Sequence, residues 1–233
     1  LPPGSNVVLP EHVYYGYRLA AEEFFPRWGL TATLAPLDRP GALEAALRPG
    51  TRLVWLESPS NPLLRVTDLA RCAAVAKAAG ATVAVDSTFA TPVLQRPIEL
   101  GADVVLHATT KGMGGHSDVQ GGALVFREKG ELLEKARHVR HVLGAVSSPF
   151  NSWLVLRGLR TPAVRAPHQA ASALTVSRAL EEHAAVSRVN YPGLPSHSGH
   201  AVAARQMSAF GSMISCHVGA GEGAAVRAVG RAR

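Results

Sequence analysis

The sequence predicts an α/β fold built on a mainly parallel β-sheet. Short apolar runs typical of buried strands alternate along the chain with segments whose apolar residues have helical spacing. The run at residues 52–57 lacks the polar alternation of a half-exposed strand, which fits a sheet covered by helices on both faces. Polar residues follow directly after several of the expected strands, where such sheets bind their ligands.

The first half of the chain predicts four strands and three helices. An apolar run at residues 5–9 is typical of a buried strand. Helical spacing predicts a helix over residues 14–28, which Gly29 ends. The other elements expected here are a strand at 30–34, a short helix at 41–47, a strand at 52–57, a helix after Thr67 and a strand at 82–85.

The helix after Thr67 has the clearest end signals. Thr67 is a suitable N-cap and Gly80 a suitable C-terminal stop. Its apolar positions predict an inner face, which consists of Leu69, Cys72, Ala73 and Ala76.

The second half predicts strands at residues 103–107 and 122–126, followed by a charged helix at 131–142. Two further helices are expected at 153–159 and 168–183, with breaks near Pro162 and Pro167, because proline cannot donate a helical hydrogen bond. Two later apolar runs predict strands, at 186–190 and 213–218.

Composition excludes several classes of protein. The 233-residue chain has a net charge of +7, but its arginines are scattered and no basic run alternates with aromatic residues, so a nucleic-acid partner is not expected. No apolar run reaches the ~18 residues that would span a bilayer, so no membrane partner is expected. Cys72 and Cys216 are expected to be buried, reduced thiols, which favours the cytoplasm.

Asp86 and Lys111 suggest a specific chemistry. Asp86 ends one expected strand, and Lys111 follows the next strand among small and hydroxyl residues. Pyridoxal phosphate (PLP) enzymes need such a pair: the lysine forms a Schiff base with the aldehyde, and the acid keeps the pyridine nitrogen protonated. The alternative is that Lys111 is an ordinary surface lysine and that Asp86 only caps the following turn. In that case neither residue would have a catalytic role.

Five motifs give the chain a family resemblance. They are ESPSNP at 57–62, VDSTFATP at 85–92, TTKGMGGHSD at 109–118, LRGLRT at 156–161 and YPGLPSH at 191–197. In this order the sequence resembles the Cys/Met-metabolism family of PLP enzymes, and most of all the cystathionine γ-synthases. The resemblance implies the fold type I of PLP-dependent transferases, with residues 1–164 in a PLP-binding large domain and residues 165–233 in a smaller α+β domain.

The resemblance also implies an activity. A cystathionine γ-synthase replaces the γ-substituent of an activated homoserine with the sulfur of cysteine. The alternatives are a cystathionine or methionine γ-lyase, which eliminates that substituent, and a non-catalytic fragment of such an enzyme. The expected partners are amino-acid substrates, namely activated homoserine and cysteine or cystathionine, and further copies of the chain in a homo-oligomer, a tetramer. Family members are longer at both ends, so an internal portion of such an enzyme is expected.

The resemblance assigns roles to further residues. Asn61 is expected to bind the 3-hydroxyl oxygen of the cofactor, although an asparagine between two prolines also suits a turn. Tyr14, or the adjacent Tyr15, is expected to stack on the ring and assist proton transfer. Thr110 is expected to bind the phosphate. The family usually has serine three residues before the lysine, where this chain has Ala108, so one phosphate hydroxyl is lost unless Thr109 replaces it.

Other patterns carry little weight. Residues 219–224 fit a dinucleotide fingerprint that follows an expected strand and opens an expected helix, but a lone match is weak and no acidic ribose partner follows. The scattered histidines include no metal-binding spacing, so no metal is expected. His116 is expected to be a structural hydrogen-bonding residue.

Overall fold

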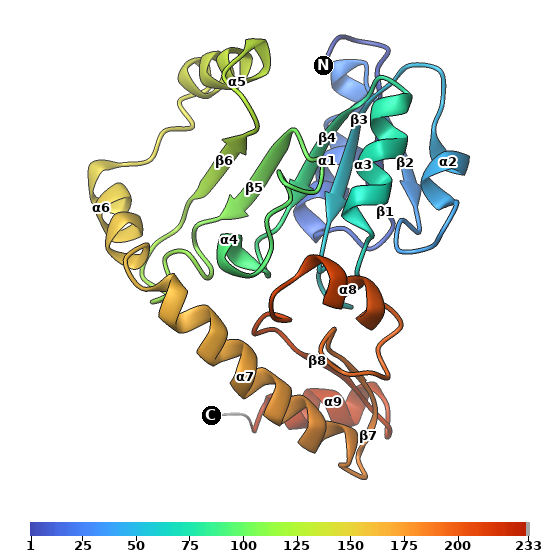
Figure 1. Ribbon diagram of the computed structural model, residues 1–233, viewed down its shortest axis with the longest axis vertical. Coiled ribbons are helices and arrows are strands. Elements are labelled where there is room, and N and C mark those ends of the chain that lie inside the picture. The colour runs from blue at the N-terminus through green and yellow to red at the C-terminus, as the bar shows by residue number, and fades with distance from the viewer. Residues whose placement is uncertain (232–233) are drawn as a thin grey trace.

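The computed structural model describes residues 1–231. Its centre is a six-stranded sheet with the order β2-β1-β3-β4-β5-β6 (Figure 1). The strands are β1 (Asn6–Pro10), β2 (Thr31–Ala35), β3 (Thr51–Glu57), β4 (Thr82–Asp86), β5 (Val104–Ala108) and β6 (Gly122–Phe126). All neighbours pair in parallel except β5 and β6, which are antiparallel. The predicted α/β class and mainly parallel sheet are therefore confirmed.

Helices cover both faces of this sheet. On one face, buried residues of the central strands such as Val54 and Leu56 pack against α2 (Ala42–Ala46) and α3 (Leu69–Ala78). On the other face, Val7 and Leu9 pack against α1 (Tyr15–Glu23). Alternate residues of one strand thus enter two separate cores, which explains why these strands are apolar without alternation.

The predicted inner face of α3 is confirmed, because all four of its residues are buried. The predicted N-cap is wrong. Asp68 is the N-cap, since its side chain accepts a hydrogen bond from the N–H of Arg71. Thr67 is buried beside it, and its N–H donates to Ser58 Oγ at 3.2 Å.

Proline explains two further differences. The helix expected over residues 14–28 ends at Glu23 and is followed by the short 3₁₀ helix η1 (Pro26–Trp28). Pro26 has no N–H to donate to the carbonyl four residues earlier, which favours the end of the α-helix before it. In contrast, α7 (Pro162–Glu181) contains Pro167 and continues, where a break was expected. The lost hydrogen bond is offset by burial of Ala166, Ala170 and Ala173 on the inner side of α7.

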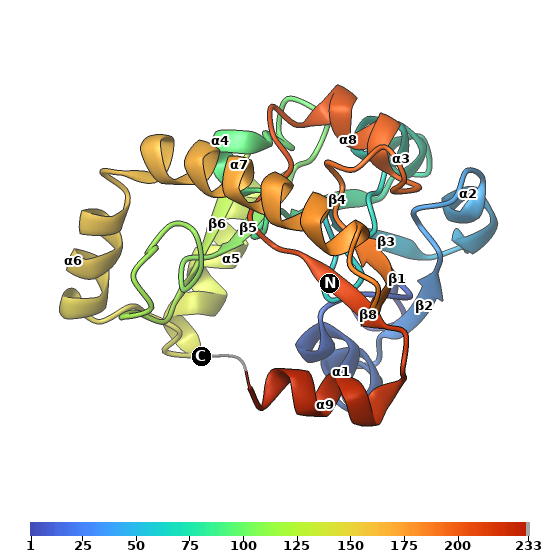
Figure 2. The same cartoon turned by 90° about the horizontal axis from the view of Figure 1, so that it is seen from below.

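The C-terminal part packs against α7. The sheet leads through α5 (Glu131–Val142) and α6 (Pro149–Gly158) into α7, which crosses the molecule to a two-stranded antiparallel sheet of β7 (Val186–Asn190) and β8 (Ser215–Val218) (Figures 1 and 2). The fully buried Tyr191 donates its hydroxyl towards the carbonyls of Ala170 and Gly211, at 3.1 and 3.0 Å. This contact fixes α7 against the C-terminal part. The expected domain boundary at residue 165 falls near the start of α7.

Two short helices were not anticipated from the sequence: α4 (Thr91–Leu94) and α8 (His200–Gln206). The helix expected to open at residues 219–224 is α9 (Glu222–Val229). Cys72 is buried as expected, but Cys216 is exposed on β8, so the expectation of two buried thiols is wrong for Cys216. On a two-stranded sheet, one face of β8 remains open to water.

Within residues 1–231, no helix is both long and apolar enough to cross a bilayer.

Candidate active site

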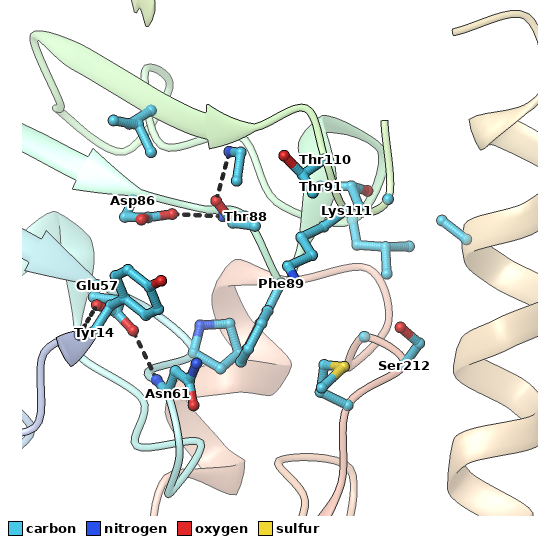
Figure 3. A pocket seen from close by; sticks show the side chains of 18 of the residues that line it. Tyr14, Glu57, Asn61, Asp86, Thr88, Phe89, Thr91, Thr110, Lys111 and Ser212 are labelled. Carbon is cyan, nitrogen blue, oxygen red and sulfur yellow. Dashed lines mark hydrogen bonds between the residues drawn. The ribbon is translucent and has the colours of Figure 1, made fainter. Parts of the chain in front are cut away.

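A cavity of about 560 Å³ lies at the carboxyl ends of β3, β4 and β5 (Figure 3). Parallel strands bring these ends to one edge of the sheet, which is where α/β proteins bind ligands. The C-terminal part closes the cavity from the opposite side, with residues 211–213 and Ala166 and Gln169 of α7. Every predicted site residue except Thr109 lines the cavity: Tyr14, Asn61, Asp86, Thr110 and Lys111.

Asp86 is the last residue of β4 and is 8 % exposed. Its Oδ1 accepts the N–H of Thr88 at 2.9 Å, and its Oδ2 accepts the hydroxyl of Tyr17 at 3.3 Å. Burial, followed by the charge of Asp86, raises the pKa of Tyr17, so the phenol stays protonated and donates to the carboxylate. Residues 1–231 provide no ion pair for Asp86, although a buried carboxylate is costly without a cation.

Lys111 lies in the tight loop after β5, and its side chain points into the cavity (Figure 3). The small residues around it are required by close contacts. A Cβ on Gly112 would lie 2.6 Å from Cγ2 of Thr91, and a Cβ on Gly114 would lie 2.7 Å from the carbonyl oxygen of Thr109. From α7, Arg165 donates to the carbonyl of Gly112 at 2.9 Å. The loop that presents the lysine is therefore held by packing and by a guanidinium.

The three residues before Lys111 alternate in direction. Ala108 and Thr110 line the cavity, whereas Thr109 is 5 % exposed and does not line it. The hydroxyl of Thr110 accepts the N–H of Gly121 at 3.0 Å and donates towards its carbonyl at 3.3 Å. The N–H of Ala108 donates to Thr88 Oγ1 at 2.9 Å, which connects the Lys111 loop to the Asp86 loop. Position 108 thus faces the cavity with a methyl group.

Tyr14 and Asn61 come from two loops that a single residue connects. Tyr14 lines the cavity, while the neighbouring Tyr15 is 71 % exposed and does not line it. The N–H groups of Tyr14 and Asn61 each donate to the carboxylate of Glu57 at 2.7 Å. Burial raises the pKa of Glu57 to about 7, against the lowering effect of these two hydrogen bonds.

Two histidines lie near the site without entering it. His107 is 3 % exposed on β5, and burial lowers its pKa, so its ring is neutral at pH 7. Its Nδ1 has no partner among the described residues. His116 uses Nδ1 to donate to the carbonyl of Gly114 at 2.7 Å, in keeping with the structural role expected for it. No group of metal-ligating side chains gathers in the described part of the chain.

Sequence reasoning missed Tyr17, Glu57 and Thr88. Tyr17 lies three residues after Tyr14, on the same side of the helix start, which was an available signal. Glu57 pairs with Asp86 in the register of β3 and β4. Glu57 and Asp86 are seen to be neighbours only once β3 and β4 are known to be adjacent. Neither the motif at 57–62 nor the motif at 85–92 could reveal this by itself.

The chain is similar to known PLP-dependent enzymes along almost its whole length. A family model described as "Cys/Met metabolism PLP-dependent enzyme" matches residues 1–232. The chain is 47% identical over 225 residues to a cystathionine gamma-synthase of Mycobacterium tuberculosis (strain H37Rv), which covers 97% of this chain and 58% of that protein. It is 42% identical over 216 residues to a cystathionine beta-lyase of Coxiella burnetii, which covers 92% of this chain and 56% of that protein.

A solved structure agrees with the sequence matches. The cystathionine gamma synthase from Xanthomonas oryzae pv. oryzae, in complex with aminoacrylate and cysteine, superposes with a TM-score of 0.93 at 43% identity. The match covers 98% of this chain and 58% of that one. The chain therefore spans just under three fifths of the length of these relatives.

Proposed function

The chain belongs to the Cys/Met-metabolism family of PLP-dependent enzymes, and we propose that it serves a trans-sulfuration reaction in which cysteine sulfur replaces the γ-substituent of an activated homoserine. The observation that carries this proposal is a single cavity lined by Asp86, Lys111, Asn61 and Tyr14. Among the relatives named above, identity is higher to the cystathionine γ-synthase than to the β-lyase, which favours replacement over elimination.

The residues around the cavity fit PLP. The carboxylate of Asp86 is buried and has no cationic partner in residues 1–231, and a protonated pyridine nitrogen would supply one. Lys111 is the only lysine among the cavity-lining residues and would bind the aldehyde. Tyr14 would stack on the ring, Asn61 would donate to the 3-hydroxyl oxygen, and Thr110 would bind the phosphate.

When bound, PLP supplies an electron-accepting ring that stabilises negative charge on the substrate carbon next to the amino group. Asp86 would preserve that capacity by keeping the ring nitrogen protonated, and the Tyr17 hydroxyl would fix the carboxylate in place. The neutral amine of Lys111 would move protons at Cα and Cβ of the substrate. The Tyr14 hydroxyl would assist this proton transfer.

Product analysis separates the candidate reactions. We expect the native protein to form cystathionine and the free carboxylic acid when it is given PLP, cysteine and an O-acyl homoserine. Formation of a 2-oxo acid and ammonia without cystathionine would assign a γ-lyase activity instead. Bound PLP with no turnover of either kind would support a non-catalytic member of the family.

We also infer a homo-oligomer, a tetramer as in the family. The support is a row of exposed apolar side chains along α5, α6 and the loop between them: Val139, Val142, Leu143, Val146, Phe150, Trp153 and Leu156. Monomeric proteins rarely expose apolar patches of large extent.

We further infer two domains, at residues 1–164 and 165–233. We infer a reducing compartment, the cytoplasm, because both cysteines are free thiols.

A further inference from the structure

Glu57 occupies an unusual position at the edge of the sheet. It is the last residue of β3, is 5 % exposed, and accepts one backbone N–H on each carboxylate oxygen. Oε2 accepts from Tyr14, in the loop between β1 and α1, and Oε1 accepts from Asn61, in the loop after β3; both distances are 2.7 Å. One side chain thus holds the two loops that present Tyr14 and Asn61 to the cavity (Figure 3).

The surroundings of Glu57 make its charge sensitive to pH. It forms no ion pair within residues 1–231, and its register neighbour on β4 is a second carboxylate, Asp86. Burial is the main cause that raises its pKa to about 7, and the charge of Asp86 adds to the effect. In the cavity described above, the titratable groups that share the lining with Glu57 are Asp86, Tyr14, Tyr17 and Lys111. On its other side, Glu57 lines a small pocket together with Glu11, His12, Asp38 and Arg65.

Only the ionised form can satisfy both N–H groups fully. A carboxylate has two equivalent acceptor oxygens, whereas a protonated acid turns one of them into a donor. The same limit applies to glutamine, whose amide NH₂ would face a backbone N–H donor. Either change therefore leaves one of the two loops without its hydrogen bond.

We propose that Glu57 is a positioning residue whose ionised carboxylate holds the Tyr14 and Asn61 loops in the geometry that binds the cofactor ring. The inference rests on the proposed function for the identity of the ligand, but the holding of the loops does not. Loop order and cofactor affinity therefore rise with pH through neutrality. The contribution of Glu57 to global stability has the opposite sign, because ionising a buried carboxyl is costly: it is present at low pH and lost as pH rises through about 7.

Hydrogen exchange of the cofactor-free native protein tests the loops directly. Between pH 6 and pH 8 we expect the protection factors of the Tyr14 and Asn61 amides, corrected for base catalysis, to rise about tenfold, following the ionised fraction of a group with a pKa of about 7. In Glu57→Gln, one of the two amides should lose about tenfold in protection, and the pH dependence should disappear. Glu128→Gln is the matched control, because Glu128 is exposed on the surface and should leave both amides unchanged.

Titration with PLP links the loops to the cofactor. As pH rises, the Kd for PLP should fall in the unmodified protein but not in Glu57→Gln. Glu57→Asp keeps the charge and should restore part of this pH dependence. Protection of both amides that is independent of pH and unaffected by Glu57→Gln would overturn the inference. The pH response of the unmodified protein decides the matter even if the variant does not fold. If the amides respond as expected but PLP does not bind, the proposed function fails while the loop-holding role of Glu57 stands.

Discussion

Replacing Ala108 by serine should tighten cofactor binding. Ala108 lines the cavity three residues before Lys111, on the same side as Thr110, the predicted phosphate ligand. Its N–H is already used by Thr88 Oγ1 at 2.9 Å, so the backbone there is fixed and only the side chain changes. A serine hydroxyl would add one donor to the phosphate. A single such hydrogen bond contributes ~1.4 kcal/mol, or about tenfold in Kd.

Equilibrium titration of the cofactor-free native protein with PLP measures this effect. Thr109→Val is the internal control, because Thr109 is buried and does not line the cavity, so its loss should leave Kd unchanged. If Ala108→Ser has no effect and Thr109→Val weakens binding, Thr109 is the phosphate ligand. If neither substitution changes Kd, position 108 does not face the phosphate and the placement of the cofactor is wrong.

Three further outcomes are expected. Asp86→Asn keeps the size of the side chain but removes the charge, so turnover should fall by several orders of magnitude while PLP still binds; near-normal turnover would reduce Asp86 to a turn residue. Leu56→Ala, at a position that is 0 % exposed in the central strand β3, should lower the free energy of unfolding in urea by ~2–5 kcal/mol, and a loss below 1 kcal/mol would mean that the core repacks around it. Sedimentation of the native protein should give a tetramer, and a stable monomer would contradict the assembly inferred from α5 and α6.

The central strands β1, β3 and β4 were predictable because most of their residues are buried. A short apolar run such as residues 52–57, bounded by turn residues, favours a buried strand, and the structure places β3 there from Thr51 to Glu57. The short helices α4 and α8 have too few turns to show a helical period, so sequence alone could not define them. Pro167 misled in the other direction, because α7 continues through it, with the neighbouring Ala166 and Ala170 buried.

The site was predictable to the extent that it depends on strand ends. Asp86 and Lys111 line one cavity because parallel strands bring their carboxyl ends to one edge. The contacts between the two loops that carry them depend on strand register and on the direction of side chains in the loops. That Thr88 connects the two loops, and that Thr109 turns away where Ala108 and Thr110 do not, are consequences of the folded backbone.

The most direct test of the proposed site is to locate the lysine that binds the cofactor. The native protein should be incubated with PLP, reduced with borohydride and mapped by peptide mass. This chain has four lysines, and in the structure Lys77 pairs with Asp103 and Lys135 with Glu131, both outside the cavity. We predict a stable adduct on Lys111. An adduct on Lys77 or Lys129, with Lys111 unmodified, would contradict the site.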